Sequence, residues 1–302
     1  MTLDLPGEEV MGLRESFADI LKSNEPLAPC TDLRIGGPAE MLITPRSREE
    51  LLRVVKNCFE EKFPLRVLGN GSKVLVRDEG VKGVVLRLNH PAFAEIQVEG
   101  NRVKVGSGAK LMDLIAQTTT NGLSGFETLV GITGTLGGCI RCNAGDRWGE
   151  MADFIVRVEL LAETGQVHVR ERSDLHFSEH ASDIDDPVIL NVEFRLEKDS
   201  LESIEKRMRK AWIQRKAVLP YSFQSAIRVF KHPRGFSAST LIDRAGMSKA
   251  KVGPAEISDR NANWIIAQPG TQAQDILKLV EQVQTKVKAV TGVQLEREMI
   301  VW

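Results

Sequence analysis

The 302-residue sequence has little of three features that would define its class directly: long apolar runs, cysteine, and an excess of one charge. No apolar run approaches the roughly 20 residues of a membrane-spanning helix, so we expect no membrane partner. The 40 basic and 41 acidic residues give a net charge of −1, a balance that does not favour a nucleic-acid partner. The N-terminus carries early acidic residues and lacks the pattern of a secretory or transit signal, which favours a cytoplasmic location.

The four cysteines are Cys30, Cys58, Cys139 and Cys142. The spacing of Cys139 and Cys142 is compatible with a redox pair or with half of a zinc site. No second pair and no Cys or His at ligand spacing completes a metal site, so we predict no metal. We favour the interpretation that these cysteines are small core residues.

Glycine is concentrated in the stretch from Gly131 to Gly145, GITGTLGGCIRCNAG. Glycine costs about 1 kcal/mol relative to alanine in a helix, and it is favoured where the backbone needs a positive φ or approaches another group closely. The composition therefore argues against a helix or an ordinary strand. It predicts that a flat or anionic group lies against this backbone.

A second cluster, LGNGSK from Leu68 to Lys73, stands between two short apolar runs that read as strands. Exposed amide N–H groups in such a turn suit an anion such as a pyrophosphate. A tight hairpin turn is the alternative interpretation. Neither the Walker pattern nor the dinucleotide fingerprint is present here.

Strands and helices are mixed along the rest of the chain. The periodicity predicts a helix over 10–23, a helix that begins at a capping box at Ser47, and a helix over 272–291. Turn residues predict hairpins at 96–105 and 155–169. A shift to charge-rich sequence at 197–199 indicates a domain boundary.

Six ordered motifs resemble those of the UDP-N-acetylenolpyruvoylglucosamine reductase family, in its shorter form. The second glycine cluster and its continuation, LGNGSKVLVRD, are similar to the family pattern LGxGSNLLxxD, and the long glycine run is similar to the pattern GIPGTxGGA…NAG. The other motifs are TDLRIGGPA at 31–39, VFKHP at 229–233, LIDRAG at 241–246 and LERE at 295–298.

This resemblance implies an α+β fold, in which a two-part FAD-binding module of the vanillyl-alcohol-oxidase type is followed by a smaller α+β substrate domain. We expect an N-terminal helical extension over 1–26, the FAD-binding domain over 27–197 and the substrate domain over 198–302. The implied cofactor is FAD, with NADPH as co-substrate. The implied cofactor-binding residues are Gly69, Asn70, Gly71, Ser72, Lys73, Gly131, Gly134, Thr135, Gly137, Gly138, Asn143 and Gly145.

The resemblance also implies the chemistry. In the family, hydride passes from the flavin to an enol ether, a serine protonates the neighbouring carbon, and a glutamate and an arginine stabilise the developing enolate. The glutamate matches Glu298, but the serine position is Arg228 and the arginine position is His180. These three are the candidate catalytic residues, and Lys231 and Asn263 are the candidate substrate-binding residues.

A guanidinium stays charged and donates a proton poorly, so Arg228 is a poor replacement for a serine acid. Two functions therefore remain open. In one, the chain reduces UDP-N-acetylglucosamine enolpyruvate to UDP-N-acetylmuramate for peptidoglycan, with the positive charge from Arg228 and the proton from His180 or Ser225. In the other, it is an FAD-binding homologue with a different substrate or no reductase activity.

Each of these residues also has a structural interpretation. Glu298 is compatible with a solvated strand position, His180 with a surface histidine, and Lys231 with a solvated lysine. Arg228 is compatible with an ion pair to Glu298 or to a phosphate. We expect a monomer that binds a UDP-sugar.

Overall fold

The computed structural model describes residues 7–146, 148–220 and 225–302. The chain divides into two compact units. Unit 1 comprises Met1–Glu25, Ala39–Gly69 and Lys82–Ile213, and unit 2 comprises Pro26–Pro38, Asn70–Val81 and Gln214–Trp302. The predicted pyrophosphate turn is thus divided between the units after Gly69. The first six residues of the predicted N-terminal extension lie outside the described residues, and the three predicted domain ranges stay predictions.

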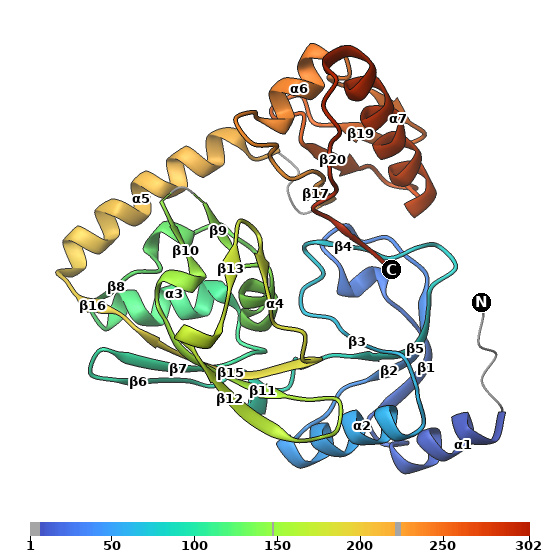
Figure 1. Ribbon diagram of the computed structural model, residues 1–302, viewed down its shortest axis with the longest axis vertical. Helices are drawn as coiled ribbons and strands as arrows, with labels where there is room; N and C mark the ends of the chain where they lie inside the picture. The colour runs from blue at the N-terminus through green and yellow to red at the C-terminus, as the bar shows by residue number, and fades with distance from the viewer. Residues whose placement is uncertain (1–6, 147, 221–224) are drawn as a thin grey trace. The chain divides into compact units, whose positions relative to one another are not determined.

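An antiparallel five-stranded sheet in unit 1 has the strand order β12-β11-β15-β7-β6, and α3 and α4 pack against it (Figure 1). Its core includes Phe126, whose ring meets the rings of Phe154 and Phe194 edge to face at centroid distances of 5.3 and 5.0 Å. The bounds are β6 Ile96–Glu99, β7 Arg102–Gly106, α3 Leu111–Thr120, α4 Leu136–Arg141, β11 Ile155–Leu161, β12 Val167–Glu171 and β15 Val188–Arg195. Both predicted hairpins are confirmed as the pairs β6–β7 and β11–β12.

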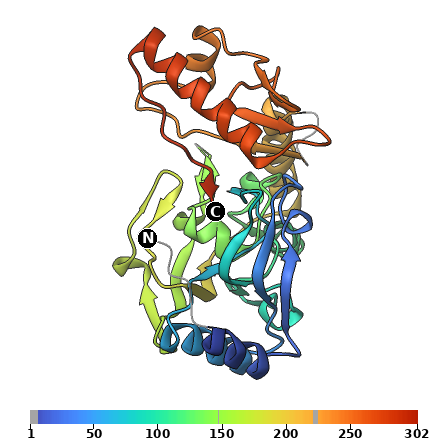
Figure 2. The ribbon, with the colours of Figure 1, turned by 90° about the vertical axis from the view of Figure 1, so that its right-hand side faces the viewer.

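The other sheet of unit 1 has the order β1-β2-β5-β3, and the helices α1 and α2 lie side by side next to it (Figure 2). The bounds are α1 Gly7–Ser16, β1 Leu21–Pro26, β2 Pro38–Ile43, α2 Arg48–Glu60, β3 Leu65–Val67 and β5 Val81–Leu86. The Ser47 hydroxyl accepts a hydrogen bond from the Glu50 N–H and caps α2, as predicted. The predicted helix over 10–23 is wrong beyond Ser16, because Leu13 and Phe17 enter the core and the polar residues from 21 on form a sheet-edge strand.

In unit 2, α6 and α7 pack on an antiparallel sheet of order β17-β20-β19-β18. The predicted helix over 272–291 is confirmed as α7, whose apolar face is buried. The bounds are β17 Ala226–Arg228, α6 Ala238–Arg244, β18 Lys251–Val252, β19 Ala255–Ile257, β20 Trp264–Ala267 and α7 Ala273–Thr291. The boundary between the units falls within the helix α5, Leu201–Val218.

Several two-residue strands complete the structure: β4 Val74–Leu75, β8 Leu123–Ser124, β9 Gly145–Asp146, β10 Gly149–Glu150, β13 Phe177–Ser178, β14 Ala181–Ser182, β16 Glu197–Lys198 and β21 Ile300–Val301. The runs on either side of the second glycine cluster do not form a hairpin. Strand β3 pairs with β5, and β4 pairs with β21, both in parallel.

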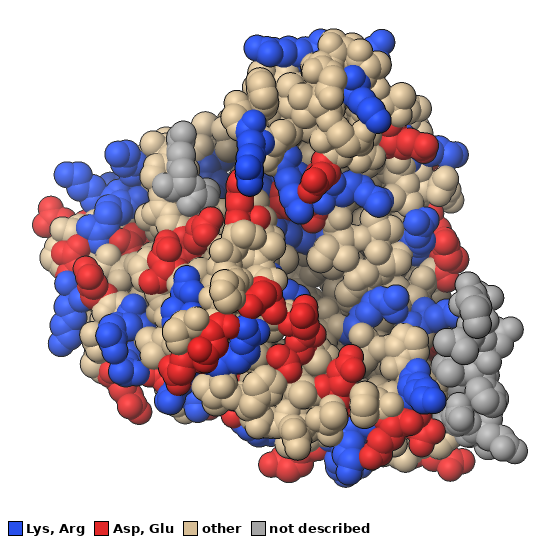
Figure 3. Space-filling view, in the orientation of Figure 1, with Lys and Arg blue, Asp and Glu red and all other residues tan. Residues whose placement is uncertain are grey.

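Acidic and basic side chains are interspersed over the face of the molecule in Figure 3, as the balanced composition predicts. Among the described residues, none of the helices has the length and apolar content that a membrane span requires.

Candidate functional site

The two glycine clusters meet within unit 1 at Gly69 and Thr135. A Cβ built on Gly69 would lie 2.3 Å from Thr135 Oγ1, so glycine is needed for this close approach. Thr135 also forms an isolated β-bridge with Lys110. Gly69 and Thr135, which are 66 positions apart in sequence, therefore lie in contact within unit 1.

The glycine-rich run contains a helix, contrary to the prediction. Helix α4 begins after Thr135, and its first amides are held by the turn that follows β7: the Leu136 N–H donates to the Ala109 carbonyl and the Gly137 N–H to the Ser107 carbonyl, both at 2.8 Å. A Cβ on Gly137 would come within 3.1 Å of Ser107 Cβ. Tertiary contacts with this turn thus outweigh the low helix propensity of glycine.

Most of the predicted glycines have a reason within the protein itself. Gly71, Gly131 and Gly134 have positive φ angles of 66°, 86° and 142°, which favour glycine. A Cβ on Gly145 would lie 2.5 Å from Glu150 Cα across the β9–β10 pair. These positions need glycine for the fold, whether or not a ligand is bound.

Gly138 is different, because it lies inside α4 with an ordinary helical φ. A Cβ built there would meet Thr135 Oγ1 at 3.8 Å, an ordinary contact, with nothing nearer in the described part of the chain. Alanine would favour the helix by about 0.5–1 kcal/mol at such a position. The space in front of Gly138 is therefore not used by the protein.

Ser107 has a polar atom that the protein leaves unused. The residue is buried, and its Oγ has no hydrogen-bond partner among the described residues. Buried hydroxyls are normally satisfied, so an unsatisfied one indicates a ligand or a water. Ser107 was not among the residues predicted from the sequence, although Gly106-Ser107-Gly108 has the same glycine-rich composition as the other two clusters.

Asn143 is fully buried, and its side chain forms hydrogen bonds within the protein. Its Nδ2 donates to Glu150 Oε2 at 2.6 Å and to the Ser178 carbonyl at 3.0 Å, and its Oδ1 accepts from the Ala152 N–H at 3.1 Å. These contacts occupy both ends of the amide, so the role that the structure shows for Asn143 is to fix α4 to its surroundings.

His180 lies in the turn between β13 and β14 of unit 1, with a left-handed φ of +56°. Histidine is enriched in this conformation relative to most residues other than glycine. Arg228 and Glu298, the other candidate catalytic residues, belong to unit 2. A catalytic role of His180 therefore stays a prediction.

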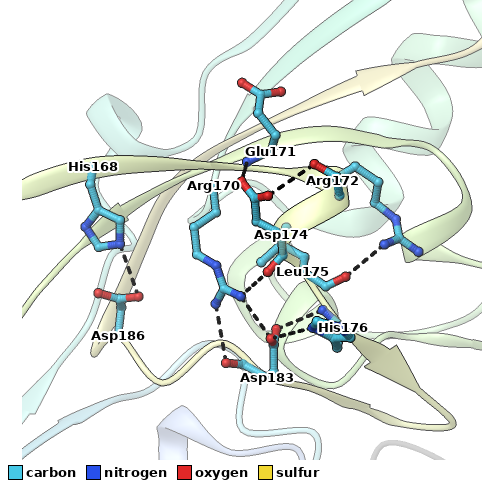
Figure 4. A network of polar contacts seen from close by, with 10 residues as sticks. His168, Arg170, Glu171, Arg172, Asp174, Leu175, His176, Asp183 and Asp186 are labelled. Atoms are coloured by element: carbon cyan, nitrogen blue, oxygen red, sulfur yellow. Dashed lines mark hydrogen bonds and ion pairs between the residues drawn. The ribbon is translucent and has the colours of Figure 1, made fainter.

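The chain next to this turn is held by charged side chains (Figure 4). Asp183 Oδ2 accepts from Arg170 Nη2 at 2.9 Å and lies 3.2 Å from His176 Nδ1, and His168 lies 3.5 Å from Asp186. Partial burial raises the pKa of Asp183, but the hydrogen bonds from Arg170 and His176 outweigh it, and the pKa lies below its ordinary value. This network fixes the two ends of the β13–β14 hairpin.

Arg141, at the end of α4, adds a second attachment. Its guanidinium donates to the carbonyls of Ile184 and Asp186, both at 2.6 Å, and Ser182 Oγ donates to the Arg141 carbonyl at 3.0 Å. The hairpin that carries His180 is therefore anchored to the helix that carries Gly138.

Glu298 lies in unit 2 between two cations. Its Oε2 is 2.6 Å from Arg228 Nε, and its Oε1 is 2.7 Å from Lys73 Nζ. The Glu298 side chain is 3% exposed, whereas those of Arg228 and Lys73 are 27% and 28% exposed. Of the two partners considered for Arg228, Glu298 or a phosphate, the structure shows Glu298, and Lys73, a candidate cofactor-binding residue, contacts the same carboxylate.

The path of the C-terminal segment explains this arrangement. The Lys231 N–H donates to the Glu296 carbonyl and the Glu298 N–H to the Val229 carbonyl, so the segment first runs beside residues 229–231. It then turns to pair with β4, where the Ile300 N–H donates to the Lys73 carbonyl. Glu298 stands where the segment changes partners, which directs its carboxylate between residues of both.

The two candidate substrate-binding residues differ in the structure. Lys231 is exposed and lies 3.4 Å from Glu296. Asn263 is 1% exposed, and its amide accepts from the Phe230 N–H at 3.0 Å and donates to the Phe230 carbonyl at 2.8 Å. Asn263 thus holds β20 to the strand that leads to Lys231, and this use of its amide argues against direct substrate contact.

The interpretation of the cysteines as core residues is confirmed for Cys58 and Cys139, which are buried. Burial raises the pKa of the Cys58 thiol to about 12. Cys142 is only partly buried at the end of α4. Over the described residues, no group of three His, Cys, Asp or Glu side chains is placed to hold a metal ion.

Comparison with known proteins agrees with this geometry. Residues 39–170 match the FAD binding domain family, and residues 219–302 match the family described as the UDP-N-acetylenolpyruvoylglucosamine reductase, C-terminal domain. The fold and these matches define an FAD-binding protein of α+β class with a reductase C-terminal domain, as predicted.

Relatives match over nearly the whole chain. A UDP-N-acetylenolpyruvoylglucosamine reductase from Caldanaerobacter subterraneus subsp. tengcongensis is 34% identical over 294 residues, covering 95% of this chain and 97% of that protein. One from a Bradyrhizobium species is 37% identical and covers 92% and 91%. The crystal structure of the UDP-N-acetylenolpyruvylglucosamine reductase from Thermus caldophilus is 36% identical, covers 93% and 98%, and superposes with a TM-score of 0.81. The chain belongs to the UDP-N-acetylenolpyruvoylglucosamine reductase family.

The residues of unit 1 fit FAD, the cofactor that the matched domain family binds. The open space at Gly138 and the unused Ser107 hydroxyl lie on either side of Gly137, beside the contact of Gly69 with Thr135. A backbone without Cβ atoms together with a buried polar atom is what a flat, anionic dinucleotide requires. Ser107 therefore joins the predicted cofactor-binding residues.

Proposed function

We propose that the protein catalyses the NADPH-driven, FAD-dependent reduction of UDP-N-acetylglucosamine enolpyruvate to UDP-N-acetylmuramate. The observation that carries this proposal is Glu298, the residue that matches the family glutamate, which lies buried between Arg228 and Lys73. A buried carboxylate that is held by cations is typical of a preorganised charged site. Glu298 and Arg228 are the proposed catalytic residues in unit 2, with His180 proposed in unit 1.

FAD would supply the chemistry of hydride transfer between NADPH and the enol ether, and the glycines predicted to bind it would hold it. The ammonium of Lys73 and the guanidinium of Arg228, both beside Glu298, would offset the negative charge that develops on the substrate carboxylate. Lys231 is proposed to bind a phosphate of the substrate.

The product is a precursor of peptidoglycan, so we assign the protein to cell-wall synthesis in the cytoplasm and through it to cell shape and division. We further propose that it acts as a monomer with a UDP-sugar as its small-molecule partner. The absence of an excess of one charge in the sequence agrees with a small-molecule ligand rather than a nucleic acid.

An anaerobic spectral titration of the purified protein tests the function. We expect a yellow protein whose flavin absorbance is bleached by NADPH and restored by UDP-N-acetylglucosamine enolpyruvate, with UDP-N-acetylmuramate as the product. Bleaching that this substrate does not reverse would show that the chain reduces a different acceptor. A protein that binds no FAD would contradict the proposal entirely.

A further inference from the structure

Two departures from the family pattern meet at one carboxylate. Lys73 stands where the resembled pattern has asparagine, and Arg228 stands where it has the proton-donating serine. The two positions are 155 residues apart in sequence, yet Nζ of Lys73 and Nε of Arg228 contact the two oxygens of Glu298 at 2.7 and 2.6 Å. Compared with the family pattern, this chain thus lacks the proton-donating serine but has a lysine in contact with the same glutamate.

The two cations are not equivalent as acids. A guanidinium keeps its proton in proteins, whereas a lysine ammonium can transfer a proton to a stronger base and serves as an acid or base in many enzymes. Arg228 can therefore supply charge but not a proton. Lys73 can supply both.

We infer that Lys73 is the catalytic proton donor of this chain and takes over the role of the missing serine. The inference rests on the proposed reductase function. Glu298 is the residue that positions it, because the carboxylate holds the Nζ atom at hydrogen-bond distance and Arg228 holds the carboxylate from its other oxygen. With 28% of its side chain exposed, Lys73 remains accessible to both a ligand and water.

The proton balance of this step is complete. Reduction of the carbon–carbon double bond adds a hydride equivalent, which comes from NADPH through FAD, to one carbon and a proton to the other. An N–H bond of the Lys73 ammonium breaks and leaves its electron pair on nitrogen, while the new C–H bond forms on the carbon next to the carboxylate. The neutral amine then regains a proton from solvent.

The first test separates charge from proton donation at position 73. The protein is reduced with NADPH without oxygen and mixed rapidly with the enol ether, and the rate of flavin reoxidation is followed. Lys73→Arg keeps the charge but lacks a dissociable proton, so we expect reoxidation to slow by about 10²–10⁴-fold relative to the unaltered protein when both are fully loaded with FAD and fully reduced before mixing. Reoxidation of Lys73→Arg at the unaltered rate would overturn the inference.

Chemical rescue provides a second variant that does not depend on how well arginine fits. In Lys73→Ala, added methylammonium should restore reoxidation in proportion to its concentration, whereas Lys73→Arg should not respond. Lys251→Ala is the matched control, because Lys251 is an exposed lysine of the same unit that lies 2.6 Å from Glu256. This variant should reoxidise at the unaltered rate, and methylammonium should not change that rate. If methylammonium does not restore reoxidation in Lys73→Ala and Lys73→Arg is active, another group supplies the proton.

A third measurement needs no activity. The acetylation rate of each lysine by acetic anhydride is measured by peptide mass spectrometry in the unaltered protein and in Glu298→Gln. Loss of the carboxylate removes the ion pair that holds the Lys73 Nζ atom, so acetylation of Lys73 should accelerate while that of Lys251 stays unchanged. Equal rates at Lys73 would show that Glu298 does not position it in solution.

The outcomes also separate this inference from the proposed function. If the unaltered protein is not bleached by NADPH or not reoxidised by the enol ether, the proposed function fails. If the unaltered protein turns over and Lys73→Arg does too, only the assignment of the proton donor fails.

Discussion

Among the described residues, unit 1 buries Glu127 against an arginine and unit 2 buries Glu298 against another, but the two glutamates have different surroundings. Glu127 of unit 1 lies 2.7 Å from Arg207 Nε and also accepts from the Gly125 N–H at 2.6 Å and from Ser124 Oγ at 2.9 Å. Glu298 of unit 2 lies between Arg228 and Lys73. Their side chains are 4% and 3% exposed, so burial alone does not distinguish them.

The partners make the difference. Two of the three partners of Glu127, Gly125 and Ser124, lie within three residues of it, which is typical of a carboxylate that stabilises a loop. The two cationic partners of Glu298 come from segments distant in sequence, and both are partly exposed. Cation exposure does not separate the two sites, because Arg207 is 40% exposed. A buried carboxylate whose two oxygens each meet a cation from a distant segment is suited to act on a ligand, whereas one that also accepts from local donors is suited to hold the fold.

The largest effect is expected when the Glu298 carboxylate is removed. Glu298→Gln should slow flavin reoxidation by the enol ether by about 10²–10⁴-fold, because the anion that positions the two cations is lost. Bleaching by NADPH should remain, which rapid-mixing spectroscopy can measure separately. A variant that reoxidises normally would show that Glu298 is structural, like Glu127.

Glu127→Ala should act on stability instead. We expect the free energy of unfolding, measured with urea, to fall by about 2–3 kcal/mol, because hydrogen bonds to a buried charged group are lost. Glu256→Ala is the control, since the exposed pair of Glu256 with Lys251 should contribute at most about 1 kcal/mol. An equal loss in both variants would contradict the distinction between the two kinds of pair.

The pH dependence of stability tests the structural role of Glu127. Burial raises the pKa of Glu127, but the hydrogen bonds from Gly125, Arg207 and Ser124 outweigh it, so the pKa lies below the ordinary value of 4.5. A lowered pKa in the folded state contributes stability above the unfolded value, and this contribution is lost as the pH falls through the folded value. The stability difference between the unaltered protein and Glu127→Gln should therefore be full at pH 7 and shrink below about pH 4.5, as urea unfolding over that range would reveal.

Asn263→Ala should lower the free energy of unfolding by about 1–3 kcal/mol, because the N–H and the carbonyl of Phe230 lose their buried partner. The KM for the enol ether should change little, since the amide faces the protein. A large rise in KM with unchanged stability would instead support the substrate-binding role predicted from the sequence.

The smallest effect on stability is expected at Gly138, where two quantities should move in opposite directions. Gly138→Ala should stabilise the FAD-free protein by about 0.5–1 kcal/mol and weaken FAD binding tenfold or more, a loss of about 1.4 kcal/mol, because the new methyl group enters the cofactor's space. Gly12→Ala in α1 is the control, because a Cβ there would meet nothing within 4 Å, and it should stabilise the protein without affecting FAD binding. Fluorescence quenching of added FAD and urea unfolding measure the two quantities. An unchanged FAD affinity would show that the space at Gly138 is not part of the cofactor site.

Local sequence patterns predicted those helices whose formation depends on residues close together in the sequence. The periodic apolar face of α7 and the Ser47 cap of α2 are confirmed because each depends on spacing within a few residues. The helix at 10–23 was wrong after Ser16, since its apolar residues serve a helix and then a strand. Helix α4 was missed because its stability comes from the turn at 107–109 rather than from its own residues.

The sequence alone determined the family through six ordered motifs, and the resemblance to that family implied the α+β class and the FAD cofactor. The glycines by themselves indicated only that a flat or anionic group lies against the backbone. It also identified Glu298 and Arg228 as a candidate pair. Only the tertiary structure decided which glycines serve the fold and which leave space, that Ser107 is unsatisfied, and that Lys73 reaches the same carboxylate as Arg228. The physical reason is that an ion pair or an unused hydroxyl depends on which distant segments pair, and no local pattern specifies that the C-terminal segment changes partners at Glu298.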